Sequence, residues 1–136
     1  MKSAKAYLEQ AYHIDARINS KLEQVHALRE LATKASVGYS DMPGSPNRRT
    51  DKLESIMAKI IDYENEINND IDKLVDLRKE IGSVINKVPN LDYQTLLEQR
   101  YISFKTWEQI AVFMNYNLRW IYKLHSAALE EVEKLI

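Results

Sequence analysis

The sequence predicts an all-α protein in which a long two-helix antiparallel coiled-coil arm is followed by a helix-turn-helix unit. Two long stretches carry apolar seven-residue repeats, one loop-rich stretch separates them, and helix-capping signals cluster near the carboxyl end. The 136 residues include only three glycines and three prolines, which favours helix over sheet. We therefore expect a helical hairpin over residues 1–88, with a loop at 36–50, and a helix-turn-helix domain over residues 89–136.

The first long helix is expected from Ser3 to about Ala35. Apolar residues recur every seven positions, and a second apolar row falls three residues after the first, where Lys21 interrupts it. The first row consists of Ala4, Ala11, Ile18, Val25 and Ala32. The apolar stripe is widened by Leu8, Leu22 and Leu31.

The stretch from Ser36 to Arg49 has the composition of a loop. It gathers glycine, proline, serine and asparagine, the residues that most often break helices. Arg48 and Arg49 could contact phosphate groups, although two adjacent arginines in a loop are more often simply solvated.

The second long helix is expected from Asp51 to about Lys87, with Glu54 completing a helix-start signal. Its apolar residues recur strictly every seven positions, and Asp70 is the one exception in the second row. Its partner is either the first helix, folded back, or another copy of the chain. The repeat consists of Leu53, Ile60, Ile67, Leu74, Ile81 and Val88.

No metal site or cofactor is expected, and we predict that the protein is not an enzyme. Asp62, Glu66 and Asp70 recur at four-residue spacing, but no histidine or second carboxylate-bearing helix joins them, which favours a solvated or partner-facing stripe. The chain has no cysteine, no glycine-rich phosphate loop and no serine, histidine and carboxylate arrangement typical of hydrolases.

A short helix is expected from Leu91 to Tyr101. Pro89 ends the preceding helix, because the residue before a proline is pushed out of helical geometry, and Asn90 can cap the new helix. The residues expected to pack under the helix-turn-helix are Leu96, Leu97 and Tyr101.

The helix-turn-helix is predicted from three local signals. Thr106 and Gln109 form a capping box, Asn115 can adopt a left-handed turn conformation, and Asn117 can cap the second helix. That helix is expected to continue to Ile136. The residues expected to face inward are Ile110, Ala111, Ile121, Leu124 and Ala128.

The outer face of the second of these helices could lie in a DNA major groove. Arg119 could donate two hydrogen bonds to guanine, Lys123 could reach guanine or phosphate, and Leu118 could touch a thymine methyl group. The competing interpretation is a helical hairpin whose polar face is only solvated. The expected DNA-binding residues are Asn117, Leu118, Arg119, Trp120, Tyr122, Lys123 and Ser126.

Five residues near the carboxyl end each have a separate expected role. Arg100 and Lys105 are candidate phosphate contacts, with a salt bridge inside the domain as an equal alternative for Arg100. Trp107 is expected in the core or as a lid over it, and His125 as a partly buried histidine. Trp120 could either lie against the DNA backbone or pack on the preceding helices.

The distribution of charge favours DNA contact at the carboxyl end, although the net charge is only −1. Residues 51–85 contain five basic and nine acidic residues, whereas residues 100–126 contain four basic residues and one acidic residue. The longest unbroken apolar run, Ile110 to Met114, is too short to span a membrane, and the first residues lack the apolar stretch of a signal peptide. We therefore expect a cytoplasmic protein with no membrane partner.

The last third of the chain contains a set of residues whose order and spacing resemble those of a known group of proteins. This set consists of Arg100-Tyr101, Trp107-Glu108, Ile110-Ala111, Asn115-Tyr116, Arg119, Ile121-Tyr122, Leu124-His125 and Ala128-Leu129. These residues resemble region four of bacterial sigma factors, and resemble more closely the sigma-like segment of phage proteins in the ArpU and RinA late-gene regulator group. Two positions depart from the pattern: Asn115 stands where many relatives have glycine, and Trp120 where sigma factors usually carry a charged residue.

The resemblance implies a sequence-specific phage or prophage transcription regulator. Such a protein would bind double-stranded promoter DNA and recruit or modify host RNA polymerase, in the cytoplasm of the bacterial host at the nucleoid. The coiled coil would form a homodimer or hold a protein partner. Two alternatives stay open: the small subunit of a phage terminase, which recognises DNA for packaging, and a coiled-coil adaptor that does not bind DNA.

Overall fold

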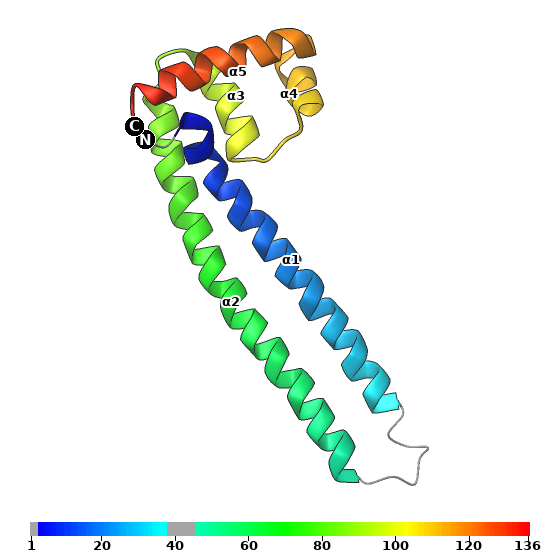
Figure 1. Cartoon of the computed structure of the whole chain (residues 1–136). Coiled ribbons are helices and arrows are strands. Elements are labelled where there is room, and N and C mark those ends of the chain that lie inside the picture. The colour runs from blue at the N-terminus through cyan, green and yellow to red at the C-terminus, as the bar shows by residue number, and fades with distance from the viewer. Residues whose placement is uncertain (1–2, 38–45) are drawn as a thin grey trace. The chain divides into compact units, whose positions relative to one another are not determined.

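The computed structural model describes residues 3–37 and 46–136, with side chains described for residues 3–36 and 50–136. In this part of the chain every regular element is a helix, which confirms the all-α prediction (Figure 1). The helices are α1 (Ala4–Val37), α2 (Pro46–Asn86), α3 (Leu91–Tyr101), α4 (Trp107–Met114) and α5 (Leu118–Glu133). None of the helices in these described ranges is long and apolar enough to cross a membrane.

The chain forms two compact units, and each contains a part of both long helices. Unit 1 consists of residues 1–15 and 73–136, and unit 2 consists of residues 16–72. The division of the chain near residue 88 stays a prediction. Within unit 1, Tyr12 of α1 and Arg78 of α2 both pack against Phe104, in the segment between α3 and α4.

The second long helix begins earlier than predicted. It starts at Pro46, five residues before Asp51, so the predicted start was wrong. Proline fits the first turn of a helix, because the N–H group that it lacks would have no intrahelical partner there. Residues 38–45 of the predicted loop lie outside the described residues, and so do the side chains of Arg48 and Arg49.

The last helix ends earlier than predicted. It ends at Glu133 rather than at Ile136, and the N–H of Leu135 donates to the carbonyl oxygen of Val132, 2.9 Å away. A hydrogen bond to the carbonyl three residues back is typical of a last turn that tightens and stops.

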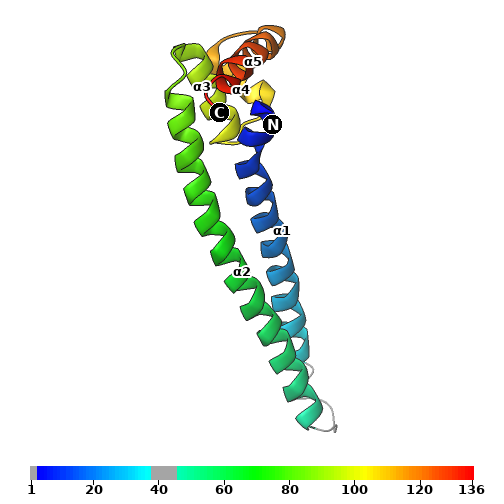
Figure 2. The ribbon, with the colours of Figure 1, turned by 60° about the vertical axis from the view of Figure 1, so that its left-hand side comes forward.

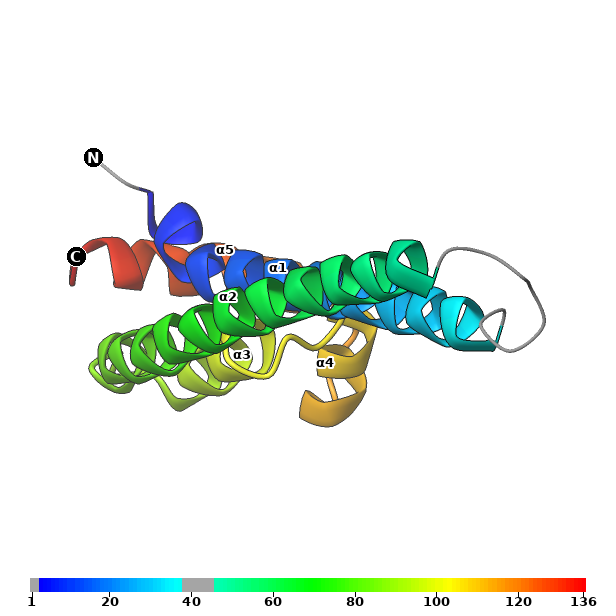
Figure 3. The same cartoon turned by 90° about the horizontal axis from the view of Figure 1, so that it is seen from below.

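In unit 2 the segments of α1 and α2 lie side by side and run in opposite directions (Figures 1, 2 and 3). Lys21 pairs with Asp70, and Arg29, later on α1, pairs with Glu64, which lies earlier on α2. The order of these two pairs is that of an antiparallel helix pair. The buried residues of the unit come from the predicted rows and are Ile18, Val25, Ile60, Ile67 and Asp70.

The two charged residues that interrupt the apolar rows pair with each other. The Lys21 ammonium lies 2.7 Å from one carboxylate oxygen of Asp70 and 3.9 Å from Glu66. The side chains of Lys21 and Asp70 are only 16% and 8% exposed, so the pair forms a polar layer within an apolar interface. Leu22 and Leu31, which were predicted to widen the apolar stripe of α1, are instead exposed, whereas Leu8 is buried.

In unit 1 the three short helices pack on one another, and α5 contacts both α3 and α4. Most of the residues predicted to face inward are buried, and Val132 joins them. Ala111 is only half-buried. The buried residues of the three helices are Leu96, Leu97, Tyr101, Ile110, Ile121, Leu124, Ala128 and Val132.

Candidate nucleic-acid interface

The start of α4 is fixed by the predicted capping box. The Thr106 hydroxyl accepts a hydrogen bond from the Gln109 N–H at 3.2 Å, and the Gln109 side chain accepts one from the Thr106 N–H at 2.9 Å. Two backbone donors that the helix leaves without an intrahelical partner are therefore satisfied.

The turn between α4 and α5 has the predicted conformation. Asn115 is left-handed, with φ 58° and ψ 42°, and the N–H of Tyr116 donates to the Ala111 carbonyl at 3.0 Å. The side chain of Asn117 caps α5 by accepting a hydrogen bond from the Trp120 N–H at 2.8 Å. These local bonds set the direction in which α5 leaves the turn.

The turn is also tied to the start of α3. The Tyr116 hydroxyl donates to a carboxylate oxygen of Asp92 at 2.8 Å, and this bond raises the pKa of the Tyr116 hydroxyl above its usual value. The Tyr116 ring meets the Trp120 ring edge-on, with ring centres 6.5 Å apart. Trp120 remains 45% exposed, so it packs on a preceding element on one side and presents a wide aromatic surface on the other.

The outer face of α5 carries three of the predicted DNA-binding residues in one row. Arg119, Lys123 and Ser126 are all exposed, and successive members lie about one helical turn apart. No acidic residue occurs in α5 before Glu130. Over these three residues the row therefore offers positive charge and hydrogen-bond donors, and the first carboxylate on this side of α5 is that of Glu130, one turn after Ser126.

Leu118 departs from the prediction that it lies on the outer face. It is half-buried, because it precedes Ile121 by three residues and so flanks the core-facing side of the helix. Asn117 is exposed, but its side-chain oxygen is used in the cap.

Trp107 is the centre of an aromatic cluster between α3, α4 and α5. The guanidinium carbon of Arg100 lies 4.4 Å from a Trp107 ring centre, and the rings of His125 and Tyr122 meet Trp107 edge-on at 4.5 and 5.6 Å. The Tyr101 hydroxyl and His125 Nε2 share a hydrogen bond of 2.6 Å. These five side chains therefore help to hold the three helices together.

The side chains of His125 and Tyr101 are uncharged near neutral pH. Burial lowers the pKa of His125 to about 4, and the positive charges of Lys5 and Arg100 act in the same direction. Burial raises the pKa of Tyr101 to about 12, with a further increase from Glu9 and an opposing effect from Arg100. The Tyr101–His125 hydrogen bond is therefore a neutral structural contact.

The two predicted phosphate contacts have different surroundings. Arg100 stacks on Trp107 and donates to the Lys105 carbonyl oxygen at 2.9 Å, so its guanidinium is already engaged within unit 1. Lys105 is exposed, at the rim of a surface depression of about 440 Å³. That depression is lined by Gln99, Lys105, Glu108, Gln109, Val112 and Phe113.

Phe104 is a feature that the sequence patterns did not reveal. Its backbone has φ 57°, a left-handed conformation that is unfavourable for an aromatic residue. The Tyr12 ring meets the Phe104 ring edge-on at 5.7 Å, and the Arg78 guanidinium lies 5.0 Å from its centre. These contacts hold the α3–α4 segment against both long helices, and no glycine or asparagine marks the left-handed position in the sequence.

The described ranges, 3–37 and 46–136, contain no cluster of three or more histidine or acidic side chains arranged to hold a metal ion. No curated protein and no solved structure matches the chain. The sequence profile of one family matches residues 39–133, which is well over half of the chain. The chain therefore belongs to the family described as "Protein of unknown function (DUF1492)".

Proposed function

We propose that this protein is a sequence-specific DNA-binding regulator of phage or prophage transcription, in which α4 and α5 act as a helix-turn-helix like region four of sigma factors. In this proposal α5 lies in the major groove. Arg119 donates two hydrogen bonds to a guanine, and Lys123, about one turn further on, reaches a phosphate or a second guanine. Trp120 lies against the edge of the same groove.

The observation that carries the proposal is the exposed row of Arg119, Lys123 and Ser126 on a helix whose direction is fixed at its start. The Asn117 cap and the left-handed Asn115 leave little freedom in how α5 leaves the turn. A base-reading side chain needs such a rigid support, because its hydrogen bonds must reach base edges within a few tenths of an ångström.

The remaining partners in this proposal are double-stranded promoter DNA, host RNA polymerase and a coiled-coil arm formed by α1 and α2. Val112, which is 83% exposed, and Phe113, also exposed, give α4 an apolar surface beside Lys105 that suits a protein partner. The protein would act in the cytoplasm of the bacterial host, at the nucleoid.

The experiment is duplex binding, measured by fluorescence anisotropy over a series of salt concentrations. Fragments that tile a candidate phage genome are tested with the wild type and with the Arg119→Ala/Lys123→Ala variant. Loss of two phosphate contacts should flatten the log–log salt dependence by about two, and loss of a base contact should cost about 1–3 kcal/mol at one site. Arg119→Lys separates the two effects, because it keeps the charge and removes the two-pronged hydrogen bonding.

The matched control is Arg17→Ala/Lys59→Ala, which removes the same charges from exposed positions in unit 2. We expect this variant to bind its fragment like the wild type. If both double variants weaken binding equally, binding reflects net charge alone and α5 does not read the sequence.

The identity of the bound fragment distinguishes the proposal from its main alternative. A promoter fragment supports a transcription regulator, whereas a packaging site, together with a ring of about eight to ten subunits in solution, would support a terminase small subunit. If the wild type binds no fragment specifically at low salt, the adaptor interpretation replaces both.

A further inference from the structure

One side of the helix pair in unit 2 is apolar and exposed. Leu22 of α1 and Met57, Ile61 and Ile71 of α2 are each between 42 and 55% exposed. Soluble monomers tolerate single exposed apolar residues, but apolar residues gathered on one face mark a surface that binds a partner.

The positions of these residues follow from the Arg29–Glu64 ion pair. Leu22 lies seven residues before Arg29, and Ile71 lies seven residues after Glu64, so both flank the same side of the helix pair two turns away. Toward the other end of the helix pair, Ser36 lies seven residues after Arg29 and Met57 lies seven residues before Glu64, so these two also flank this side.

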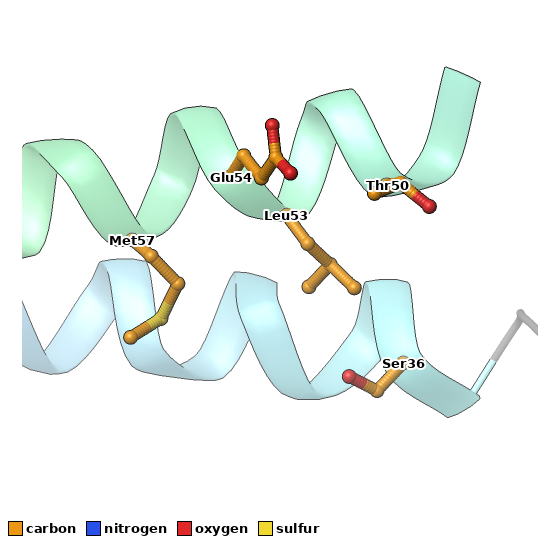
Figure 4. Close-up of a pocket in the computed structure, with 5 residues that line it drawn as sticks. All are labelled: Ser36, Thr50, Leu53, Glu54 and Met57. Atoms are coloured by element: carbon orange, nitrogen blue, oxygen red, sulfur yellow. The ribbon is translucent and has the colours of Figure 1, made fainter. Parts of the chain in front are cut away.

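A depression at the end of this side confirms the placement of Ser36 and Met57. Both line a cavity of about 430 Å³ together with Thr50, Leu53 and Glu54. Figure 4 shows Leu53 and Met57 of α2 directed toward α1, which carries Ser36. The face therefore consists of a Met57 layer, a charged layer of Arg29 and Glu64, and a layer of Leu22 and Ile71.

The opposite side of the same helix pair has a different character. Leu31 is exposed there, but its neighbours at equivalent positions on the two helices are all polar or charged, namely Arg17, Gln24, Lys52, Lys59 and Glu66. Leu22 and Leu31 are nine residues apart, which is two and a half helical turns, so they point to opposite sides of α1. Only the Leu22 side combines apolar layers with a balanced pair of charges.

We propose that a second copy of this chain docks on the face formed by Leu22, Arg29, Met57, Glu64 and Ile71. The two-fold axis runs parallel to the helices, so that α1 of each copy meets α2 of the other and each layer meets its equivalent. The interface is then a four-helix bundle with antiparallel neighbours.

Charge complementarity selects the second copy as the occupant. In this arrangement Arg29 meets Glu64 of the partner subunit, and Glu64 meets the partner subunit's Arg29, which forms a ring of alternating charges. Arg29 and Glu64 are about half exposed in one chain, so each can contact a second partner. A two-fold axis across the helices would instead bring Arg29 toward the partner's Arg29, which like-charge repulsion disfavours.

The first test compares two leucines on opposite sides of α1 that have nearly the same exposed fraction, Leu22 at 48% and Leu31 at 50%. Sedimentation velocity over a range of concentrations should show a monomer–dimer equilibrium for the wild type. Leu22→Glu should weaken the dimer by about tenfold or more, and Leu31→Glu should leave it unchanged. Circular dichroism of both variants checks that the helices are intact.

The second test uses the charged ring and requires contact between chains. Arg29→Glu and Glu64→Arg should each remove the dimer, because like charges then meet across the interface. An equimolar mixture of the two variants should regain it, because Glu at position 29 of one chain meets Arg at position 64 of the other. An ion pair within one chain cannot be restored by mixing.

The third test determines the direction of pairing, and the absence of native cysteine makes it simple. Chains carrying Leu22→Cys, mixed with chains carrying Ile71→Cys, should form disulfide-linked heterodimers under mild oxidation. A link between Leu22→Cys and Ser36→Cys chains in their place would overturn the proposed axis. A wild type that sediments as a monomer at its highest soluble concentration, or a dimer that survives Leu22→Glu, would overturn the proposal itself.

Discussion

The short helices α3, α4 and α5 and the paired helices of unit 2 depend on different kinds of sequence information. Each short helix begins with a cap whose side chain accepts from an N–H three residues ahead, at Asn90, Thr106 and Asn117. In unit 2 the helices depend on rows of apolar residues and on a contact between Lys21 and Asp70, 49 residues apart in the chain. A local signal fixes where a helix begins, whereas a long-range contact fixes what it pairs with.

The largest effect should come from disrupting the long-range contact. Asp70→Leu leaves the Lys21 ammonium within an apolar row, and we expect a loss of about 3 kcal/mol in the free energy of unfolding. Lys21→Leu/Asp70→Leu removes both charges and should restore or exceed the wild-type stability, because neither group then has to be desolvated. Urea unfolding, monitored by circular dichroism, gives the free energy of unfolding of the wild type, the single variant and the double variant.

The double variant separates stability from specificity. If it is stable but forms mixed oligomers, the polar layer serves to fix the register of the helix pair, as single buried polar residues do in other coiled coils. If Asp70→Leu alone is as stable as the wild type, the pair contributes little and the apolar rows alone specify the pairing.

The fold was predictable to the extent that its signals are local. The bounds of α3 and the caps of α4 and α5 were predicted at the residue level, because each cap requires a particular side chain at a particular place. Lys21 and Asp70 were recognised only as interruptions, because seven-residue periodicity does not say which interruption on one helix meets which on the other. Pro46 was missed as a helix start because proline is read first as a helix breaker.

A cap should have an intermediate effect that depends on its position in the helix. Thr106→Ala removes the acceptor for the Gln109 N–H and should cost about 1 kcal/mol of stability. Thr33→Ala is the matched control, because Thr33 lies inside α1, where its exposed hydroxyl donates to the Arg29 carbonyl. We expect the control to be neutral or slightly stabilising, since alanine is the better helix former. Equal losses for both variants would show that the cap has no special role.

A smaller effect of opposite sign is expected in the part of α2 that belongs to unit 1. Gly82 lies inside the helix, and a Cβ atom added there would have no heavy atom within 4 Å. Gly82→Ala should therefore raise the free energy of unfolding by somewhat less than 1 kcal/mol, because alanine loses less backbone entropy on folding. Thermal unfolding beside Ser83→Ala, at the exposed neighbouring position, is the control, and its gain should be the smaller of the two because serine is a better helix former than glycine. A loss of stability would mean that α2 requires a flexible residue there.

The candidate site was less predictable than the fold, for a physical reason. Arg119, Lys123 and Ser126 follow from helical periodicity, which places them away from Ile121 and Leu124. The contacts of the aromatic cluster bring together residues from three helices. Helix periodicity identifies the side of each helix but not the neighbour that it meets, so neither the stacking of Arg100 on Trp107 nor the bond between Tyr101 and His125 could be derived from it.

A last effect, absent at neutral pH, should come from acidification, through the cluster that holds the short helices together. The pKa of His125 is about 4 in the folded chain, below the ordinary value of 6.5, so only the unfolded chain takes up this proton as the pH falls between these values. Stability should therefore decrease from about pH 6.5 toward pH 4 and gain no further dependence from this group below that range. The side chain is only half-buried, and solvent screening keeps the effect modest.

The measurement is the urea unfolding midpoint at several pH values for the wild type and His125→Gln, whose amide can still bond to Tyr101. Titrating carboxylates affect the wild type and His125→Gln equally, so the difference between their two pH profiles of stability isolates the contribution of His125. His26→Gln is the matched control, since it removes an exposed imidazole from α1. If the profile of His125→Gln runs parallel to that of the wild type, the cluster does not exclude the proton, and α3 and α5 are joined less tightly than the Tyr101–His125 contact implies.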